Sequence, residues 1–562
     1  MLKLLKKDPY IISVVLLGLL AGWWLLRPGY FNMHDDLQMM RQLAMEECFR
    51  DFQIPCRWTP HMGYGFGFPL FNYYPPLPYL IGELFRLVGF SFITTAKLTF
   101  LLSFILSGVT MYILGRELWG KTGGLLAAAF YIWAPYHSLD VFVRGAMNEA
   151  WGLIWFPLIL WSAYKLIQES KFKYMIILAL SWFALLTSHN LMVIIFAPLF
   201  SLWCLMWLTR FKAWGRIPQL ILSGVWAAGL AAFFTLPVFL EKNLVHVETL
   251  VVGYYEYVAH FANIRQLLFS RFWGYGASAW MDDDKMAFPV GHLHWILSLV
   301  VGTFVLWRLI KTKKLDNPSL IACFFLAAGW FATFMAHSRS TPIWQMIPPL
   351  KFVQFPWRFL TLVILSFSLL IGSLPTLPVF KKFNSKLLVG ILIFGVVAWN
   401  WEFFKPEKMG TLTDKEKFSN AAWDLQQTAG IYDYLPKDAW TAPKKPRERL
   451  LDIITGKGLL LEESQKTNSA RAKIRMDEEG DVRVNIFKFP GWKVFIDGKE
   501  TQVFIHEKEE WGRMYIKIPQ GEHEVAAKLT NTPVRTAGNT ISLLTWLGTL
   551  TLPFWRGKKL LA

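Results

Sequence analysis

The sequence predicts a polytopic α-helical membrane protein of about twelve spanning helices, with a mostly β domain outside the cytoplasm. Of the 562 residues, 54% are hydrophobic and only 17% are charged. A soluble protein of this length needs more charge to cover its surface. Several apolar segments match the roughly 20 residues that a helix needs to cross a membrane. Alternating polar and apolar residues later in the chain predict the strands.

The predicted spans follow one another through the first part of the chain and return near its end. Lys3, Lys6 and Lys7 precede the first apolar run. No A-x-A-like cleavage site follows that run, so we expect a retained helix and not a secretory signal. The spans lie near residues 10–26, 93–115, 124–140, 148–167, 173–188, 190–208, 217–239, 293–310, 318–336, 358–376, 386–403 and 538–555.

The basic residues between the spans predict the orientation. With the N-terminus inside, every cluster falls in loops on one side, as the positive-inside rule requires of cytoplasmic loops. The clusters are Arg116 and Lys121; Lys165, Lys171 and Lys173; Arg210, Lys212 and Arg216; Arg308, Lys311, Lys313 and Lys314; Lys381, Lys382 and Lys386; and Arg556, Lys558 and Lys559. The net charge of +18 therefore reflects these loops and predicts no nucleic-acid partner. We expect a multi-pass plasma-membrane protein with both termini in the cytoplasm.

The same topology divides the chain into domains. Residues 1–403 form the predicted transmembrane domain, and its outer loops are 27–92, 240–292 and 337–357. Residues 404–537 are long and polar enough for a soluble, extracytoplasmic domain, and residues 538–562 are the last helix and a cytoplasmic tail. In the soluble domain, turn signals separate the runs ARAKIRM, DVRVNIF, WKVFID, TQVFIH and MYIKI. This pattern predicts a small β-sandwich.

The first outer loop has two features with open interpretations. Cys48 and Cys56 flank FRDFQIP, and the sequence leaves open whether they form a disulfide. Gly63, Gly65 and Gly67 alternate with aromatic residues, which suits a loop pressed against a ligand or another backbone, or an interfacial aromatic belt. The segment at 75–88 is expected to form an amphipathic helix at the outer interface.

Ionisable residues directly after the first span are the first candidates for a site. His34, Asp35 and Asp36 lie at the mouth of a membrane helix, where charge facing lipid is costly, so we expect them to line a cavity. The alternative is that one aspartate caps the helix predicted from Leu37 to Phe52.

Four further residues are expected at the same depth. Arg144 and Glu149 in VRGAMNEAWG and His189 in TSHN lie at outer helix ends. Arg358 in QFPWRFL begins a span where a lipid phosphate would lie, and arginine suits phosphate through bidentate hydrogen bonds. The alternatives are a structural Arg144–Glu149 ion pair and interfacial snorkelling of Arg358.

Motifs for other chemistries do not occur in a credible context. This holds for the Walker motif, the Rossmann fingerprint, HExxH and the nucleophile elbow. The run from Asp282 to Asp284 is interpreted as solvated loop acid and not as a metal site. No metal is assigned, although a divalent cation stays open as a cofactor.

The segments HDDLQMMRQL, IPCRWTPHMGYGFGFPLFNYYPPL, VRGAMNEAW, QFPWRFL, YDYLP, FPGWKVFIDGKE and IPQGEHEV resemble the GT-C superfamily of membrane glycosyltransferases. More narrowly, they resemble YfhO-like bacterial membrane proteins and relatives labelled 6-pyruvoyl-tetrahydropterin-synthase-related. The resemblance spans nearly the whole chain. It implies an inverting transferase that moves a sugar from a polyprenyl-phosphate donor at the outer face.

The resemblance also implies roles for the candidate residues. The superfamily's first-loop acid carries over to Asp35, with Asp36 as its neighbour, and would deprotonate an acceptor hydroxyl. Arg144 or Arg358 would supply positive charge to the phosphate leaving group. The first loop lacks the metal-binding D-x-D pattern, which puts a metal requirement in doubt.

Two other functions are compatible with the sequence. One is a transporter or flippase of lipid-linked sugars, which the number of spans would suit. The other is a non-catalytic cell-envelope assembly protein that presents an acceptor through its β domain. The acceptor itself, whether glycan, lipid or protein, is left open by the sequence.

Overall fold

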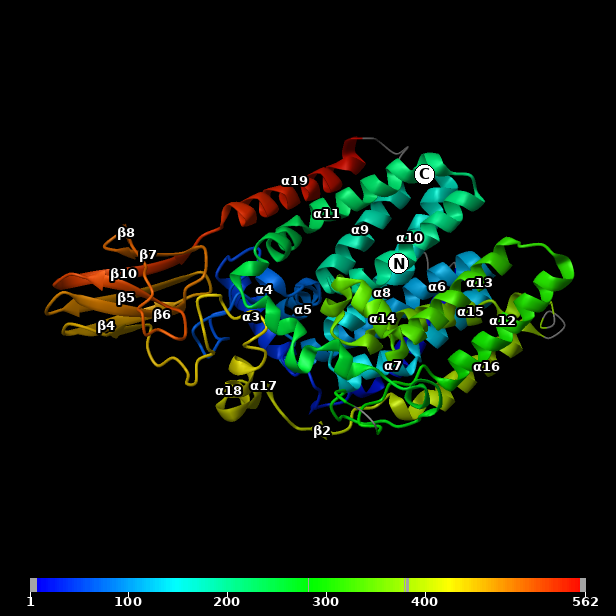
Figure 1. Cartoon of the computed structure of the whole chain (residues 1–562), viewed down its shortest axis with the longest axis horizontal. Helices are drawn as coiled ribbons and strands as arrows, with labels where there is room; N and C mark the ends of the chain where they lie inside the picture. The colour runs from blue at the N-terminus through cyan, green and yellow to red at the C-terminus, as the bar shows by residue number, and fades with distance from the viewer. Residues whose placement is uncertain (1–7, 281–282, 379, 381–383, 556–562) are drawn as a thin grey trace.

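The computed structural model describes residues 8–280, 283–378, 380 and 384–555. Along its longest axis, the molecule has a β-rich domain at one end and a body of helices over the rest (Figure 1). Some residues named above lie outside the described part: Lys3, Lys6, Lys7, Asp282, Lys381, Lys382, Arg556, Lys558 and Lys559.

The helical body confirms the predicted class of polytopic α-helical membrane protein. In the described residues, eight helices are long and apolar enough to cross a membrane, and two shorter apolar helices accompany them. The main helices are α2 (Tyr10–Ala21), α6 (Phe92–Ile132), α8 (Met147–Glu169), α9 (Phe172–Ser188), α10 (Met192–Arg210), α11 (Ile217–Leu240), α12 (His292–Thr312), α13 (Asn317–Met335), α15 (Leu360–Ile371), α16 (Ser385–Asn400) and α19 (Pro533–Trp555). Helix α19 coincides with the last predicted span but is not among the eight.

Helix α6 contains the span predicted at 93–115 and the first part of the span predicted at 124–140, because the helix ends at Ile132. Its backbone leaves the helical conformation at Gly120, where φ is 77° and ψ is 179°, a region that favours glycine. A Cβ on Gly115 would lie 2.9 Å from the Cα of Gly124, and one on Gly108 would meet the side chain of Ile132. The chain therefore reverses at Gly120, and the segments on either side pack against each other.

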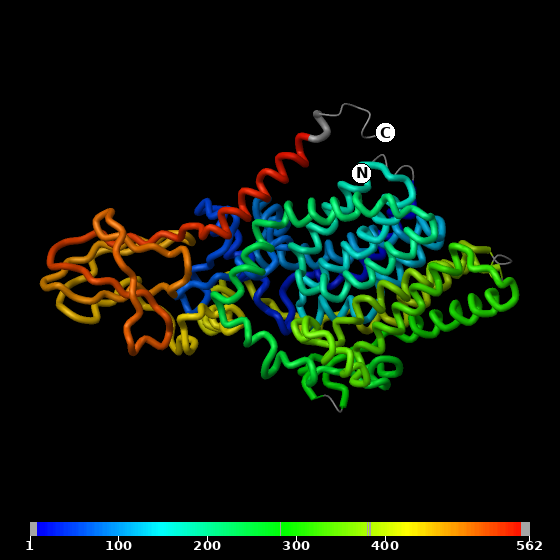
Figure 2. Tube along the Cα trace, turned by 45° about the horizontal axis from the view of Figure 1, so that its top comes forward, coloured from blue at the N-terminus to red at the C-terminus, as the bar shows by residue number. Residues whose placement is uncertain are grey.

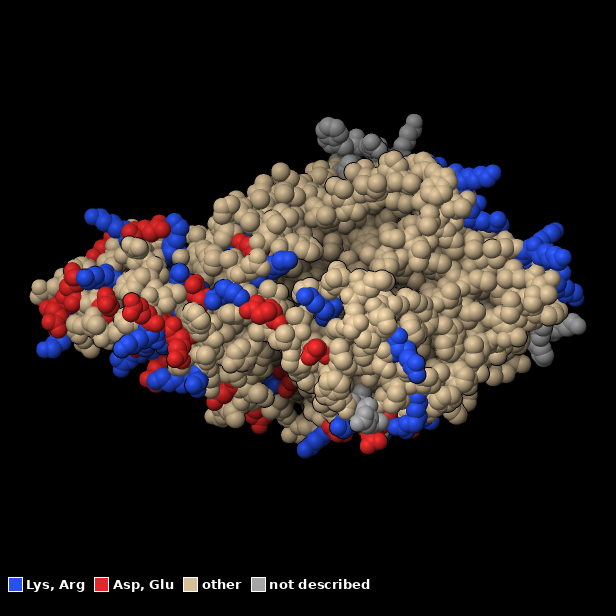
Figure 3. Space-filling view, viewed as in Figure 1, with Lys and Arg blue, Asp and Glu red and all other residues tan. Residues whose placement is uncertain are grey.

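Charge is unevenly spread over the face seen in Figure 3. Acidic and basic residues mix over the β-rich domain, whereas the surface of the helical body is largely uncharged. At the far end only basic residues gather. The turn between α12 and α13, which contains Lys313 and Lys314, lies at this end (Figure 1). This is the distribution that the positive-inside rule gives a membrane protein.

The C-terminal domain consists of two antiparallel sheets that share a core. Their orders are β4-β5-β10-β7-β8 and β3-β6-β9. Ile474 and Val494 from the first sheet and Val484 and Ile516 from the second belong to one buried cluster. The strands are β3 (Leu451–Ile453), β4 (Gly458–Gln465), β5 (Ser469–Met476), β6 (Gly480–Phe487), β7 (Trp492–Ile496), β8 (Lys499–Thr501), β9 (Arg513–Ile518) and β10 (Gly521–Leu529).

One predicted strand differs from the structure. Of the run TQVFIH, only Thr501 belongs to a strand, β8, and Phe504 makes an isolated bridge to Tyr515. The run alternates as a strand does, but its continuation runs into a turn before β9. Strands β3, β4 and β10 were not predicted. Strand β3 has only three residues, and runs of like residues interrupt the period of two in β4 (LLLEE) and β10 (VAA).

The first outer loop lies between the helical body and the β-rich domain (Figure 2). It contains α3 (Gln38–Arg50), α4 (Leu70–Tyr73) and α5 (Leu77–Leu87), and Cys48 and Cys56 in it form a disulfide. Its Trp58 and Phe66 are buried in the core of the β-rich domain. Gly67 has φ 88°, and a Cβ there would lie 2.3 Å from Trp58, so this glycine permits a close approach within the loop itself.

Two contacts join the first loop to the segment after α16. Strand β1 (Tyr30–Phe31) pairs with β2 (Met409–Gly410). The Asp414 carboxylate at the start of α17 (Asp414–Lys417) accepts backbone hydrogen bonds from the first turn of α6. These contacts place α17 and α18 (Asn420–Thr428) beside the loop that carries the first candidate residues.

Candidate functional site

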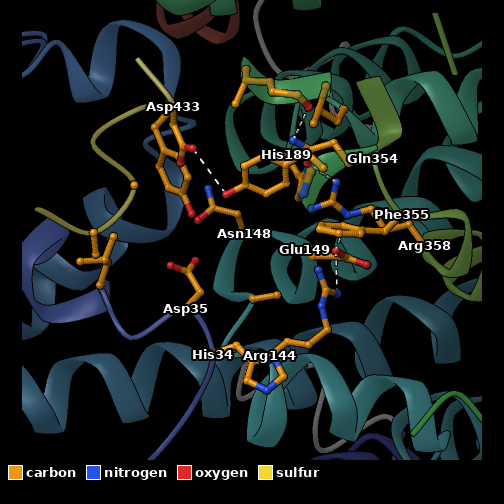
Figure 4. Close-up of a pocket in the computed structure, with 18 of the residues that line it drawn as sticks. His34, Asp35, Arg144, Asn148, Glu149, His189, Gln354, Phe355, Arg358 and Asp433 are labelled. Atoms are coloured by element: carbon orange, nitrogen blue, oxygen red, sulfur yellow. Dashed lines mark hydrogen bonds and ion pairs between the residues drawn. The ribbon is translucent and has the colours of Figure 1, made fainter. Parts of the chain in front are cut away.

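All seven predicted site residues line one cavity of about 500 Å³ at the ends of the helices. They are His34, Asp35, Asp36, Arg144, Glu149, His189 and Arg358. The residues come from four separate parts of the chain, and Figure 4 shows Asp35, Glu149 and His189 around a common space. The predicted shared cavity is therefore present in the structure.

Backbone pairing positions the first-loop residues. The N–H groups of His34 and Asp35 donate to the carbonyl oxygens of Val143 and Arg144, at 2.9 and 2.8 Å. The Gln38 amide adds a 2.7 Å hydrogen bond to the carbonyl of Gly145. These bonds fix Asp35 beside the segment that leads into α8.

The two neighbouring aspartates have different surroundings. Asp35 Oδ2 lies 2.7 Å from Arg41 Nη1, and the carboxylate is 35% exposed. Among the residues that the structure describes, none donates a hydrogen bond to Asp35 Oδ1. Asp35 therefore combines a fixed cationic partner with an oxygen that stays free.

Asp36 uses both of its oxygens. Tyr30 donates its hydroxyl to Oδ1 at 2.9 Å, and the Lys417 ammonium binds Oδ2. Lys417 is only 4% exposed, and burial raises the pKa of Asp36 above its ordinary value. The first residue before α3 is Leu37, and no side chain caps that helix, so the interpretation of Asp35 or Asp36 as a helix cap is wrong.

Glu149 holds two arginines in the opposite wall. Its Oε2 lies 2.8 Å from Arg144 Nη1 and 3.3 Å from Arg358 Nε, and its Oε1 accepts the Tyr136 hydroxyl at 2.6 Å. Glu149 is 1% exposed, and Arg144 also pairs with Asp140. Arg358 is buried as well, so it does not snorkel to the membrane interface.

Both guanidinium groups keep donors for a ligand. The Arg144 group lies 4.4 Å above the Trp357 ring and the Arg358 group 4.9 Å above the Phe355 ring. These two rings stack at 4.7 Å. Within the described residues, neither Arg144 Nη2 nor Arg358 Nη2 has a hydrogen-bond partner. Aromatic packing therefore fixes the two guanidinium groups, and their remaining N–H donors are suited to bind an anion.

The two histidines differ in their partners. His34 Nε2 lies 2.8 Å from the Tyr275 carbonyl oxygen, and burial lowers the pKa of His34. Burial and the Arg358 charge lower the pKa of His189 to about 3, so its ring is neutral. In the described part of the chain, His189 Nδ1 is buried without a partner, which leaves it available to a bound molecule.

Other lining residues were not predicted as site residues. Asp433 faces the cavity from the segment after α18, 3.5 Å from the Tyr255 hydroxyl (Figure 4). Burial raises the pKa of Asp433 to about 6. Asn148, Gln354 and Arg41 also line the cavity. Arg41 and Asp433 lie in the quoted segments HDDLQMMRQL and YDYLP, but only the fold brings them to Asp35.

The cavity residues do not form a recognisable metal site. Across the described ranges, no group of three or more His, Cys, Asp and Glu side chains is placed to hold a metal ion. Asp35 and Asp36 are each paired with a cationic side chain, whereas a divalent cation needs several oxygen ligands at once. In the acidic run, Asp284 pairs with Arg265 at 3.0 Å.

Known proteins offer distant likenesses. No protein-family profile matches the chain. An uncharacterised protein of Lactococcus lactis subsp. cremoris strain MG1363 is 24% identical over 336 residues, 56% of this chain and 52% of that protein. The chain thus spans about half the length of this curated relative.

Two solved structures align with much of the chain at low similarity. The arabinofuranosyltransferase AftD from Mycobacteria aligns with 72% of this chain and 28% of its own, at 14% identity and a TM-score of 0.41. The oligosaccharyltransferase of Archaeoglobus fulgidus, tethered with an acceptor peptide, aligns with 77% and 57%, at 13% identity and a TM-score of 0.40. Identities and TM-scores this low do not assign an activity to the chain, so the proposed function is based on the chemistry of the cavity.

Proposed function

We propose that this chain is a membrane glycosyltransferase that moves a sugar from a polyprenyl-phosphate donor to an acceptor hydroxyl at the extracytoplasmic face. One observation carries the proposal. A single cavity holds a carboxylate with a free oxygen on one side and two buried guanidinium groups with free donors on the other (Figure 4). A base and an anion site facing one space are what this transfer needs.

Asp35 is the general base in this proposal. Oδ1 accepts the proton of the acceptor hydroxyl while the hydroxyl oxygen attacks the anomeric carbon. The bond between that carbon and the lipid phosphate oxygen breaks, and the electron pair stays on the phosphate. This single displacement inverts the anomeric carbon. Arg41 orients the carboxylate through Oδ2, 2.7 Å away.

Arg144 and Arg358 receive the phosphate. The leaving group gains negative charge as the bond breaks, and positioned donors at that point stabilise the transition state. Glu149 fixes both guanidinium groups, and the aromatic pair Phe355 and Trp357 supports them. His189 and His34 are proposed to contact the sugar or the phosphate. In this arrangement the two arginines supply positive charge to the leaving group, and a divalent cation stays open as a cofactor.

The position of the cavity favours a donor that is itself a membrane lipid. Glu149 lies in the first turn of α8, Arg358 directly before α15, and His189 between α9 and α10. The site thus lies at helix ends, where lipid phosphates lie, and not at the midplane position typical of transporters. The basic turn between α12 and α13 supports a cytoplasmic location for the opposite end of the helical body. In this proposal residues 404–537 lie outside and both termini lie inside.

Transfer of a radiolabelled sugar tests the proposal. Purified protein in nanodiscs is given a panel of labelled polyprenyl-phosphate sugars and cell envelopes from a strain that lacks the protein. We expect label to enter the envelope fraction with inverted anomeric configuration, and free polyprenyl phosphate to appear in equal amount. In proteoliposomes, movement of the lipid-linked sugar across the bilayer without transfer would indicate a flippase. Neither activity would indicate an assembly protein, and both outcomes contradict the proposal.

A further inference from the structure

Two more cavities continue the candidate site toward the β-rich domain. The second cavity, of about 730 Å³, shares Tyr255, Gly430 and Asp433 with the site. The third, of about 500 Å³, shares Tyr64 with the second. Because each cavity shares lining residues with the next, the three lie side by side, and we call them together the groove.

Tyr64 is the residue that lines both the second and the third cavity. Its backbone has φ 59°, a conformation that residues other than glycine rarely adopt. The structure holds it on both sides: Tyr64 N–H donates to the Gln427 carbonyl, and Arg447 N–H donates to the Tyr64 carbonyl. Residues 427 and 447 of the C-terminal region therefore fix the backbone of Tyr64 at this place.

The third cavity is lined by buried polar groups that lack partners. Within the described residues, Thr467 Oγ1, both side-chain polar atoms of Gln465 and Arg447 Nη1 are buried with no hydrogen-bond partner. Thr467 is 1% exposed, and all three residues line the cavity. Unpaired buried polar groups are rare because each one destabilises the fold. Their concentration here points to a ligand that supplies both donors and acceptors.

The composition of the groove identifies the class of ligand. The lining of the third cavity mixes both signs of charge, with two acidic and three basic side chains: Glu47, Asp51, Arg50, Arg447 and Lys466. Because carboxylates stand among the cations, the lining does not select a simple anion. Hydroxyl groups donate and accept at once and match a mixed set of amide, hydroxyl and guanidinium partners. Tyr64 and Tyr432, which is 55% exposed, add aromatic surface that suits the apolar face of a sugar ring.

We infer that the groove binds a glycan chain as the acceptor, with its growing end at Asp35 and its earlier sugars at Tyr64 and Thr467. The inference rests on the proposed function and narrows the acceptor to a polysaccharide or oligosaccharide. Between these two ends, the glycan passes Asp433 and Tyr255, which line both the first and the second cavity.

Photocrosslinking tests the groove without requiring turnover. The full chain carries benzoylphenylalanine in place of Tyr64 in its native cells. The control carries it in place of Lys499, an exposed strand residue outside the groove. After irradiation and purification under denaturing conditions, the covalently bound material is hydrolysed and its sugars are quantified by mass spectrometry. We expect several-fold more bound sugar at position 64 than at position 499.

A second substitution separates binding from proximity. Thr467→Val removes the unpartnered hydroxyl and keeps the shape, so the sugar adduct at position 64 should fall several-fold while the thermal stability does not fall. Adducts that are only peptide or lipid, no excess over position 499, or no effect of Thr467→Val would overturn the inference. An Asp35→Asn chain should still give the adduct. If transfer is never detected but the sugar adduct at position 64 forms, the proposed enzymatic function fails and glycan binding stands. If the adduct is absent, the glycan-binding inference itself fails.

Discussion

Asp35 binds Arg41 through one carboxylate oxygen only. Arg41 Nη1 lies 2.7 Å from Oδ2, and no described residue donates to Oδ1. The next residue, Asp36, has both oxygens occupied by Tyr30 and Lys417. Two adjacent carboxylates of the same loop therefore differ in what they can do: Asp35 can accept a proton, whereas Asp36 joins the loop to α17.

The structural role of Asp36 predicts a loss of stability when it is removed. Asp36→Ala leaves the buried Lys417 ammonium without its carboxylate, which should lower the free energy of unfolding by about 2 kcal/mol. Thermal unfolding of the purified protein measures this as a lower Tm. In the double variant with Lys417→Met, part of the loss should be recovered, because no unpaired charge remains. Equal stability of Asp36→Ala and wild type would show that the pair is not structural.

The fork geometry of Arg358 predicts weaker donor binding in Arg358→Lys. Lysine keeps the charge but loses the planar set of donors, so the Kd for the polyprenyl-phosphate sugar should rise about tenfold. Equilibrium binding with labelled donor measures the change. Arg339→Lys, at an exposed position outside the cavity, is the matched control and should leave the Kd unchanged. If the Kd changes equally little in both variants, Arg358 does not bind the donor phosphate.

Asp433 predicts a particular pH dependence of stability. Burial raises its pKa from 3.8 to about 6, so between these values the folded chain holds a proton that the unfolded chain has lost. This contribution to stability is present below the lower value and is lost as the pH rises through about 6. Asp433→Asn cannot titrate. The Tm of wild type minus that of Asp433→Asn should therefore fall between about pH 4 and pH 7. A constant difference would contradict the burial of this carboxyl.

The orientation predicts where cysteine labels react. In a background with Cys204 and Cys323 replaced by alanine, Lys499→Cys on β8 should react with a membrane-impermeant maleimide in intact cells. Lys313→Cys, in the turn after α12, should react only after permeabilisation. Labelling in the reverse order would invert the topology and place the cavity on the cytoplasmic side.

Much of this organisation could be predicted from the sequence because it depends on local composition. Apolar runs gave the helices, and polar residues at helix ends gave His34, Glu149, His189 and Arg358. The partners of Asp35 and Asp36 could not be predicted from local composition, since Lys417, for example, is 381 residues from Asp36 in the sequence.

Asp433 also could not be identified as a site residue from the sequence. It follows α18 in a stretch without regular periodicity, and its role depends on the packing of that stretch over the mouth of the helical body. Sequence separation hides such a contact. The groove was also beyond prediction, because Tyr64 and Thr467 meet through the docking of the first loop on the β-rich domain.

The most direct measurement of the central claim is the rate of sugar transfer by Asp35→Asn beside that of Asp36→Asn. Asparagine keeps an oxygen for Arg41, so the fold and donor binding should persist while proton acceptance is lost. Removal of a general base typically costs about 10²–10⁴-fold in rate, and we expect a loss of this size for Asp35→Asn. Asp36→Asn should lose much less. Transfer by Asp35→Asn at the wild-type rate would contradict the assignment of the base and, with it, the proposed mechanism.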